Sequence, residues 1–201
     1  MKRDEIMKNN NFDNVNSIVK MYLQEILQEG DICIDATMGN GYDTVYLAEK
    51  VGVNGFVYAF DVQKEAIEST KKKIEKLDFE KRVSLILDGH ENIDKYVDKN
   101  IKCAVFNLGY LPRCEHKIIT KPETTLKAIK ESLNLLEENG IICISIYTGH
   151  DGGMEERNAI FDFAMNLEQK KYNVFESKFI NQKNNPPSII VIEKKKQIKN
   201  K

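Results

Sequence analysis

Short apolar runs alternate with longer amphipathic stretches along this chain, and this alternation limits the fold more than any other feature. The runs are apolar at nearly every position, which is typical of strands buried on both faces. They cover residues 32–36, 56–60, 83–87, 104–106 and 141–146. The stretches between them predict helices over residues 43–50, 64–77, 91–97, about 122–138 and 154–170. Such alternation predicts a parallel sheet with helices on both faces.

The expected helix over residues 122–138 shows how one face is assigned to the core. Leu126, Ile129, Leu133 and Leu136 recur at spacings of three and four residues, so they share one face of a helix. Gly140 follows and is expected to stop this helix. A further amphipathic stretch, residues 15–28, predicts a helix before the first strand.

The C-terminal part of the chain breaks the alternation. Two strand-like runs, residues 174–181 and 188–193, are separated by residues 182–187, which are too few for a helix. A connection that short joins antiparallel strands. We therefore predict an α/β fold with a seven-stranded, mostly parallel, Rossmann-like sheet and an antiparallel C-terminal strand.

Length and composition favour one folded domain without a membrane span. The net charge of −1 over 201 residues argues against binding nucleic acid through overall charge. No apolar run approaches the roughly 18 residues of a membrane span, and residues 1–11 lack the apolar segment of a secretory signal. We therefore expect a cytoplasmic protein.

Cys114 and His116 are too few for a metal site, and no metal is expected.

The first expected strand is followed by a glycine-containing turn and a helix, an arrangement that can bind a nucleotide. Glycines let backbone N–H groups approach a ligand, and the helix N-terminus adds further donors. The third glycine of the dinucleotide-binding fingerprint is missing, so these glycines could also serve the turn alone. The candidate cofactor-binding residues here are Asp35, Thr37, Met38, Gly39, Asn40, Gly41, Asp43 and Thr44.

The next two strands end in residues that extend this candidate site. Asp61 lies 20 residues after Gly41, where a carboxylate can accept hydrogen bonds from both hydroxyls of an adenosine ribose. Gln63 follows it, and Gly89 and His90 follow the third strand, at the adenine end of the same crevice. Both NAD and S-adenosylmethionine carry this nucleoside. The antiparallel C-terminal pair favours S-adenosylmethionine, because class I methyltransferases end in an antiparallel strand whereas dinucleotide dehydrogenases continue into a second parallel half.

The fourth strand leads into Asn107-Leu108-Gly109-Tyr110, which resembles the (Asn/Asp)-Pro-Pro-(Tyr/Phe) tetrad of amino-group methyltransferases without its two prolines. An amide oxygen and a backbone carbonyl can accept hydrogen bonds from a target nitrogen, while an aromatic ring stacks on a base. Asn107 and Tyr110 are therefore candidate catalytic residues, Asn107 also next to the cofactor and Tyr110 also next to the substrate. Taken alone, Asn107 could cap a turn and Tyr110 could belong to the core.

Four blocks of sequence resemble the bacterial rRNA methylase family. They are residues 34–44 (IDATMGNGYDT), residues 105–112 (VFNLGYLP), Gly149-His150, and residues 179–182 (FINQ) with Pro186-Pro187. The resemblance covers about residues 31–194 and implies a class I methyltransferase that uses S-adenosylmethionine and forms a homodimer. Thr148 stands where the family has a histidine. On this resemblance, residues 1–14 are an extension and residues 15–201 form a single methyltransferase domain.

The resemblance further implies a tRNA substrate. At the wobble position, in the anticodon loop, 5-aminomethyl-2-thiouridine would become 5-methylaminomethyl-2-thiouridine. Such an alkylamine has a reference pKa near 10, so holding it neutral at pH 7 costs about 4 kcal/mol unless the site lowers that pKa. His150 is the candidate base, with Asp151 in reserve, although His150 could equally make a structural hydrogen bond. Arg113, Lys117 and Lys121 are candidate phosphate contacts, or otherwise a solvated face.

Other functions stay open on the sequence alone. The same enzyme class could act on ribosomal RNA or on a small amine, and the chain could be a non-catalytic cofactor-binding module that regulates an RNA partner. A dehydrogenase is the most distant alternative. Because the net charge is near zero, any RNA would be bound by a local basic loop around residues 107–121 and not by a global field.

Overall fold

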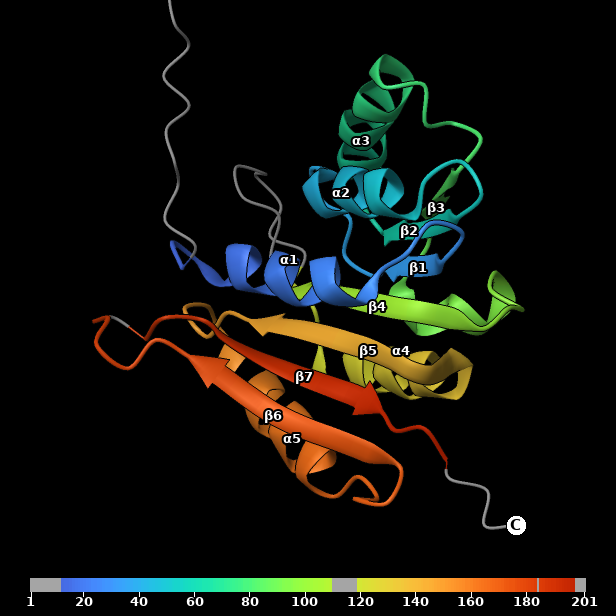
Figure 1. Cartoon of the computed structure of the whole chain (residues 1–201). Helices are drawn as coiled ribbons and strands as arrows, with labels where there is room; N and C mark the ends of the chain where they lie inside the picture. The colour runs from blue at the N-terminus through green and yellow to red at the C-terminus, as the bar shows by residue number, and fades with distance from the viewer. Residues whose placement is uncertain (1–11, 110–118, 184, 198–201) are drawn as a thin grey trace, which may run out of the picture.

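Seven strands form one sheet in the order β3-β2-β1-β4-β5-β7-β6 (Figure 1). The computed structural model describes residues 12–109, 119–183 and 185–197. Neighbouring strands from β3 to β5 are parallel, whereas β7 is antiparallel to both β5 and β6. This arrangement confirms the predicted fold class. The strands are β1 (Ile32–Asp35), β2 (Phe56–Asp61), β3 (Val83–Leu87), β4 (Ile101–Leu108), β5 (Leu136–Ile146), β6 (Tyr172–Lys178) and β7 (Ser188–Lys194).

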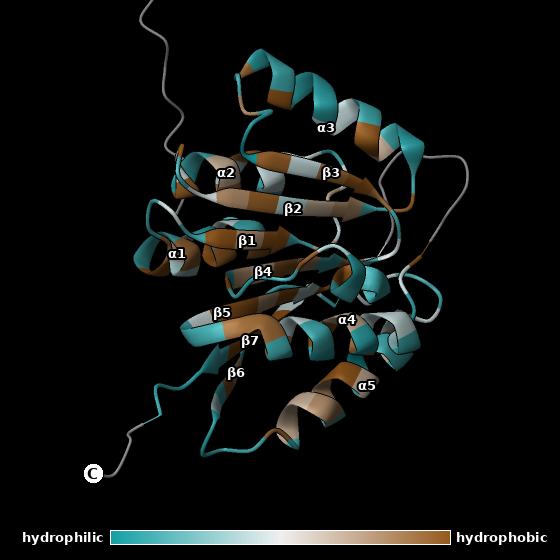
Figure 2. Ribbon diagram, turned by 90° about the vertical axis from the view of Figure 1, so that its right-hand side faces the viewer, coloured by the Kyte–Doolittle hydropathy of each residue, from teal (hydrophilic) through white to brown (hydrophobic). Residues whose placement is uncertain are grey.

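Helices cover both faces of the sheet and divide the core into two layers. One face packs against α1 (Val15–Ile26), α2 (Tyr42–Val51) and α3 (Lys64–Lys76). The opposite face packs against the 3-10 helix η1 (His90–Lys95), α4 (Pro122–Leu135) and α5 (Gly153–Met165). Figure 2 shows the central strands mostly in brown and the outward side of α3 largely in teal. The apolar strands are thus buried on both faces, as parallel strands between two helix layers must be.

Local sequence explains where several helices begin. Asn14 caps α1, because its Oδ1 accepts a hydrogen bond of 3.0 Å from the backbone N of Ser17. Gly41 precedes α2 with φ of 77°, a conformation in which glycine carries no steric penalty. Pro122 opens α4 at a position where its missing N–H costs nothing.

The boundary between α4 and β5 differs from the prediction. The helix ends at Leu135, and β5 begins at Leu136, which pairs with Ile101 of β4. Gly140 therefore does not stop the helix; it lets β5 pass close to β4, since an added Cβ would lie 2.8 Å from the carbonyl oxygen of Lys102. The side chain of Leu136 is buried in the core, so its apolar spacing could not distinguish the last helical turn from the first strand residue.

Two other expected helices are shorter than predicted. In place of the helix expected over residues 91–97, the structure has the short 3-10 helix η1, which ends at Lys95. Within it, Asn92 departs from helical geometry with φ of −107°. Helix α5 ends at Met165 and does not continue to residue 170. Among the described helices, none has the length and apolar character needed to cross a membrane.

Candidate functional site

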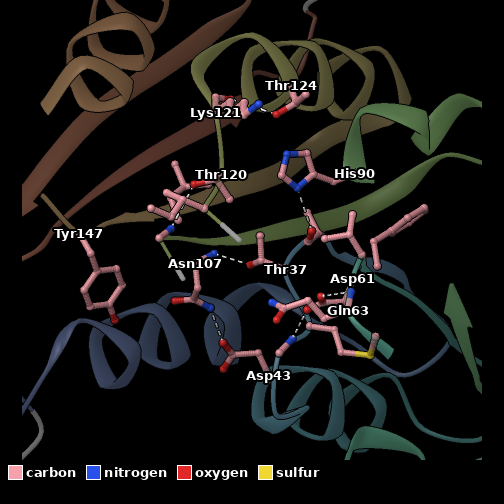
Figure 3. Close-up of a pocket in the computed structure, with 18 of the residues that line it drawn as sticks. Thr37, Asp43, Asp61, Gln63, His90, Asn107, Thr120, Lys121, Thr124 and Tyr147 are labelled. Carbon is pink, nitrogen blue, oxygen red and sulfur yellow. Dashed lines mark hydrogen bonds between the residues drawn. The ribbon is translucent and has the colours of Figure 1, made fainter. Parts of the chain in front are cut away.

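A cleft of about 730 Å³ opens at the edge of the sheet where β1, β2, β3, β4 and β5 end (Figure 3). Parallel α/β sheets bind ligands at this edge, because the connections that follow the strands converge there. The structure brings most of the sequence-predicted site residues into the wall of this cleft. They are Thr37, Met38, Gly39, Asn40, Asp43, Asp61, Gln63, Gly89, His90, Asn107, Lys121 and His150.

Three of the predicted cofactor residues lie behind the wall. Asp35 is fully buried and accepts hydrogen bonds from Thr44 Oγ1 at 2.6 Å and from the backbone N of Thr37 at 3.3 Å. Burial, and then the nearby carboxylate of Asp43, raise the pKa of Asp35 to about 7. Gly41 packs so tightly that an added Cβ would lie 2.4 Å from Thr70 Oγ1. Asp35, Gly41 and Thr44 thus shape the turn from outside the cleft.

Asp61 joins the end of β2 to the glycine turn. Its Oδ2 accepts a hydrogen bond of 2.9 Å from the backbone N of Gly39, and its Oδ1 accepts one of 2.9 Å from the backbone N of Gln63. Burial raises the pKa of this carboxyl, and these backbone donors act against the rise. The carboxylate is therefore held in one orientation at the wall of the cleft, as Figure 3 shows.

The residues after β3 supply two groups to the cleft, the imidazole of His90 and the carboxylate of Asp88. His90 Nδ1 lies 3.1 Å from the carbonyl oxygen of Ala36, which can only accept, so Nδ1 carries the proton and Nε2 is an acceptor. In the described part of the chain, this buried Nε2 has no hydrogen-bond partner. Burial lowers the pKa of His90. Hydrogen bonds from Asn92 and then Tyr96 lower the pKa of Asp88, a lining residue that the sequence analysis did not select.

Asn107 is held at the end of β4 by two short hydrogen bonds (Figure 3). Its backbone N donates to Thr37 Oγ1 at 2.6 Å, and its side-chain Nδ2 donates to Asp43 Oδ2 at 2.6 Å. The remaining amide atom, Oδ1, is buried and has no hydrogen-bond partner among the described residues. Burial raises the pKa of Asp43, while Lys20 and the bond from Asn107 act to lower it. Asn107, a residue of the cleft wall, therefore keeps one buried acceptor atom without a partner among the described residues.

His150 follows β5 and lies beside the end of β4. A Cβ added at Gly109 would be 3.6 Å from His150 Nε2, and His150 Nδ1 is 3.0 Å from the carbonyl oxygen of Asp151. The structure thus places His150 near the Asn107-Leu108-Gly109 segment, and its catalytic role stays a prediction. Tyr110, Arg113 and Lys117, like Cys114 and His116, lie outside the described residues.

Several lining residues come from parts of the chain to which the sequence analysis gave no site role. Asn16 lies in the first turn of α1, and Tyr147 follows β5; their side chains approach to 3.5 Å. Asn185 and Pro187 come from the connection between β6 and β7. The Pro186-Pro187 block was a signal for this connection, whereas nothing in the amphipathic pattern of α1 marked Asn16.

The strand order, the single reversed strand and the cleft at the carboxyl edge define a class I methyltransferase fold. Within this class, the chain belongs to the family described as "Putative rRNA methylase", whose model matches residues 57–193. The resemblance seen in the sequence blocks is thereby confirmed.

Similar proteins include two solved structures. The chain is 46% identical to a structure titled a putative rRNA-methylase from Clostridium thermocellum, with a TM-score of 0.88 over 90% of this chain and 97% of that one. It is 43% identical to a structure titled a putative methyltransferase from Streptococcus mutans in complex with SAH, with a TM-score of 0.82 over 89% of this chain and 97% of that one.

One curated relative carries a substrate in its name. The chain is 38% identical over 154 residues to the "tRNA (mnm(5)s(2)U34)-methyltransferase, chloroplastic" of Arabidopsis thaliana. That alignment covers 72% of this chain and 56% of the plant protein, so the chain spans little more than half of the relative's length.

Proposed function

We propose that this protein is an S-adenosylmethionine-dependent N-methyltransferase that converts 5-aminomethyl-2-thiouridine to 5-methylaminomethyl-2-thiouridine at the wobble position of tRNA. The observation that carries the proposal is the buried Oδ1 of Asn107, which has no hydrogen-bond partner in the described chain and belongs to a residue lining the cleft. A vacant, fixed acceptor suits a substrate nitrogen that must donate N–H bonds while its lone pair points at a methyl group. The name of the plant relative supports the substrate.

The cofactor is S-adenosylmethionine, which supplies an electrophilic methyl group carried on a sulfonium. The residues at the cleft fit its nucleoside. Asp61 retains acceptor capacity beyond the bonds from Gly39 and Gln63, because each carboxylate oxygen has two lone pairs. The neutral His90 offers Nε2 as an acceptor, in the part of the cleft that follows β3. The SAH-bound relative from Streptococcus mutans supports the same cofactor.

Asn107 positions the target amine. Because Nδ2 is bound to Asp43, the amide presents Oδ1 as an acceptor for an N–H of the substrate. Bound S-adenosylmethionine would supply the methyl group and would leave as the neutral thioether, and one proton would have to leave the methylated nitrogen. Holding the reacting groups in line lowers the barrier, because the entropy cost of aligning them is met on binding.

The proton must leave an amine whose reference pKa is near 10. His150 is the proposed acceptor, because it lines the cleft beside Gly109, two residues after Asn107. Asp151 follows in the same loop and is the reserve candidate. A partly desolvated cleft also lowers the cost of the neutral amine, since burial disfavours its charged form.

Substrate recognition by this chain involves the connection between β4 and α4. Lys121 lines the cleft, and Arg113 and Lys117 are proposed to contact phosphates on either side of the target nucleotide. Tyr110 is proposed to stack on the extruded base, which in a single-stranded anticodon loop is inexpensive to splay out. A homodimer is a further prediction of the family resemblance, and a cytoplasmic location stays a prediction from the sequence.

The second candidate function is methylation of ribosomal RNA, which the description of the matching family favours. Nucleoside analysis separates the two. In a strain lacking the protein, the methylated wobble nucleoside should disappear from tRNA and its aminomethyl precursor should accumulate. Purified protein with labelled S-adenosylmethionine should then methylate that tRNA. Normal nucleoside levels, or label only in ribosomal RNA, would overturn the tRNA assignment. Calorimetry should show binding of S-adenosylmethionine and none of NAD.

A further inference from the structure

We propose that Glu156 is a positioning residue that fixes the Gly109 end of β4 against the start of α4, and thereby sets the wall of the cleft next to Asn107. This inference rests on the proposed function for its catalytic consequence, but its structural part can be tested separately. Glu156 lies in the first turn of α5, does not line the cleft, and is not one of the residues selected from the sequence.

The carboxylate of Glu156 is buried, with 1% of the residue exposed, and it accepts two short hydrogen bonds. Thr125 Oγ1 donates to Oε1 at 2.6 Å, and Thr120 Oγ1 donates to Oε2 at 2.7 Å. No ion pair of Glu156 occurs in the described part of the chain. The hydrogen-bond partners of this carboxyl group are instead these two hydroxyls, and its residue lies in the first turn of α5.

Thr120 passes this restraint on to β4. Its Oγ1 accepts a hydrogen bond of 3.1 Å from the backbone N of Gly109, and its own backbone N donates to the carbonyl oxygen of Gly109 at 3.2 Å. A continuous series of bonds therefore runs from Glu156 through Thr120 to Gly109. In Figure 3, Thr120 lies between Asn107 and Lys121.

These hydrogen bonds determine which group the Thr120 hydroxyl donates to and which it accepts from. Because the backbone N–H of Gly109 can only donate, the Thr120 hydroxyl accepts that bond with a lone pair and donates its own proton to Glu156. Gly109 has φ of 142°, a conformation that glycine adopts freely and that side-chain-bearing residues rarely adopt. In the sequence, Gly109 and Thr120 lie on either side of residues 110–118, which include Tyr110, Arg113 and Lys117.

The test compares variants that differ in which bond they remove. Thr120→Val breaks both the bond to Glu156 and the bond from Gly109, whereas Thr120→Ser keeps them. Thr125→Val is the matched control, since it removes the other bond to Glu156 without touching Gly109. Each is assayed for methyl transfer to tRNA from a strain lacking the protein, for S-adenosylmethionine affinity by calorimetry, and for hydrogen exchange over residues 104–125.

Loss of one hydrogen bond to a charged group corresponds to about a 10- to 100-fold change in an equilibrium or rate constant. We expect kcat/KM for tRNA to fall by about that factor in Thr120→Val, to return to within about threefold of wild type in Thr120→Ser, and to stay near wild type in Thr125→Val. Cofactor affinity should be unchanged in all three. Glu156→Ala should reproduce Thr120→Val, and the double variant should lose little more, as residues in one network do.

Hydrogen exchange keeps this inference separate from the proposed function. Amide exchange around Gly109 should accelerate in Thr120→Val and Glu156→Ala but not in Thr125→Val, whichever substrate the enzyme uses. If wild-type protein fails to methylate tRNA while this exchange pattern holds, the proposed substrate is wrong and the role of Glu156 stands. If exchange is equal in the two valine variants, or both lose the same methyl-transfer activity, Glu156 is only a stabilising residue and the inference fails.

Discussion

Asp43 Oδ2 accepts a hydrogen bond of 2.6 Å from Asn107 Nδ2, which joins the first turn of α2 to the end of β4. An ionised carboxylate oxygen can only accept, so this bond turns the amide nitrogen toward Asp43 and the amide oxygen away from it. Asp43 therefore decides which end of the Asn107 amide is available to a substrate nitrogen.

Removing this partner should impair turnover. In Asp43→Ala the amide can rotate, and we expect kcat to fall about 10- to 100-fold, the equivalent of one charge-assisted hydrogen bond. Asp43→Asn still offers an oxygen to Nδ2 and should lose less. Single-turnover methyl transfer to tRNA measures the effect. Equal losses in both variants would mean that the charge of Asp43, and not its hold on the amide, matters.

Asn107→Ala should abolish most of the methyl transfer while leaving the cofactor site intact. We expect a loss in kcat of about 100-fold or more, as for removal of a group that positions the reacting atoms, with S-adenosylmethionine affinity within about threefold of wild type. The exposed Asn54, bonded to Glu29 outside the cleft, provides the control Asn54→Ala. A non-catalytic module would show unchanged activity in vivo for Asn107→Ala.

Asp61→Ala should weaken cofactor binding. The variant loses the proposed ribose acceptor and also the bonds from Gly39 and Gln63 that hold the turn. We expect the dissociation constant for S-adenosylmethionine to rise about 10- to 100-fold, as measured by calorimetry. A change of less than about threefold would place the ribose elsewhere in the cleft.

Gly41→Ala should destabilise the fold more than Gly30→Ala. Both glycines have positive φ, 77° and 96°, but an added Cβ meets Thr70 Oγ1 at 2.4 Å only at Gly41 and no atom within 4 Å at Gly30. We expect about 1–2 kcal/mol for Gly30→Ala from backbone strain, and about 1–3 kcal/mol more for Gly41→Ala from overpacking. Urea unfolding gives both values, and equal costs would show that Thr70 moves aside freely.

The buried Asp35 should make stability depend on pH. Its pKa is raised from 3.8 to about 7, so the folded state holds a proton that the unfolded state releases between these values. The stabilisation that this proton adds to the free energy of unfolding is complete below pH 3.8 and is lost as the pH rises through about 7. The slope is at most about 1.4 kcal/mol per pH unit.

Asp35→Asn cannot titrate and should remove that slope. Urea unfolding of wild type and variant at about pH 5 and pH 8 is the measurement. Wild type should lose more stability between the two than Asp35→Asn does. Parallel pH profiles would show that Asp35 is ionised in the folded protein throughout this range.

The alternation of strands and helices and the mostly parallel sheet were readable from the sequence, because they follow from local apolar patterns, whereas the order of the strands was not predicted. The reversed β7 followed from a connection too short for a helix, and the wall residues Asp61 and Asn107 followed from the ends of apolar runs. The α4–β5 boundary was not readable, since Leu136 is buried in either structure. The contacts of Glu156 with Thr120 and Thr125 join residues 31 to 36 positions apart, and no periodic pattern encodes such a pairing.

Because β7 runs against β5, its first residue lies at the same edge of the sheet as the last residue of β5. The cleft is therefore lined both by Asn16 and by Pro187, which are 171 positions apart (187 minus 16). Chains are synthesised from the N-terminus, and early segments can fold while later ones are still being made. The residues proposed for the nucleoside side of the cleft come before β4, whereas the opposite wall includes Pro187, so synthesis of the chain must reach the last strand connection before every wall of the cleft is present.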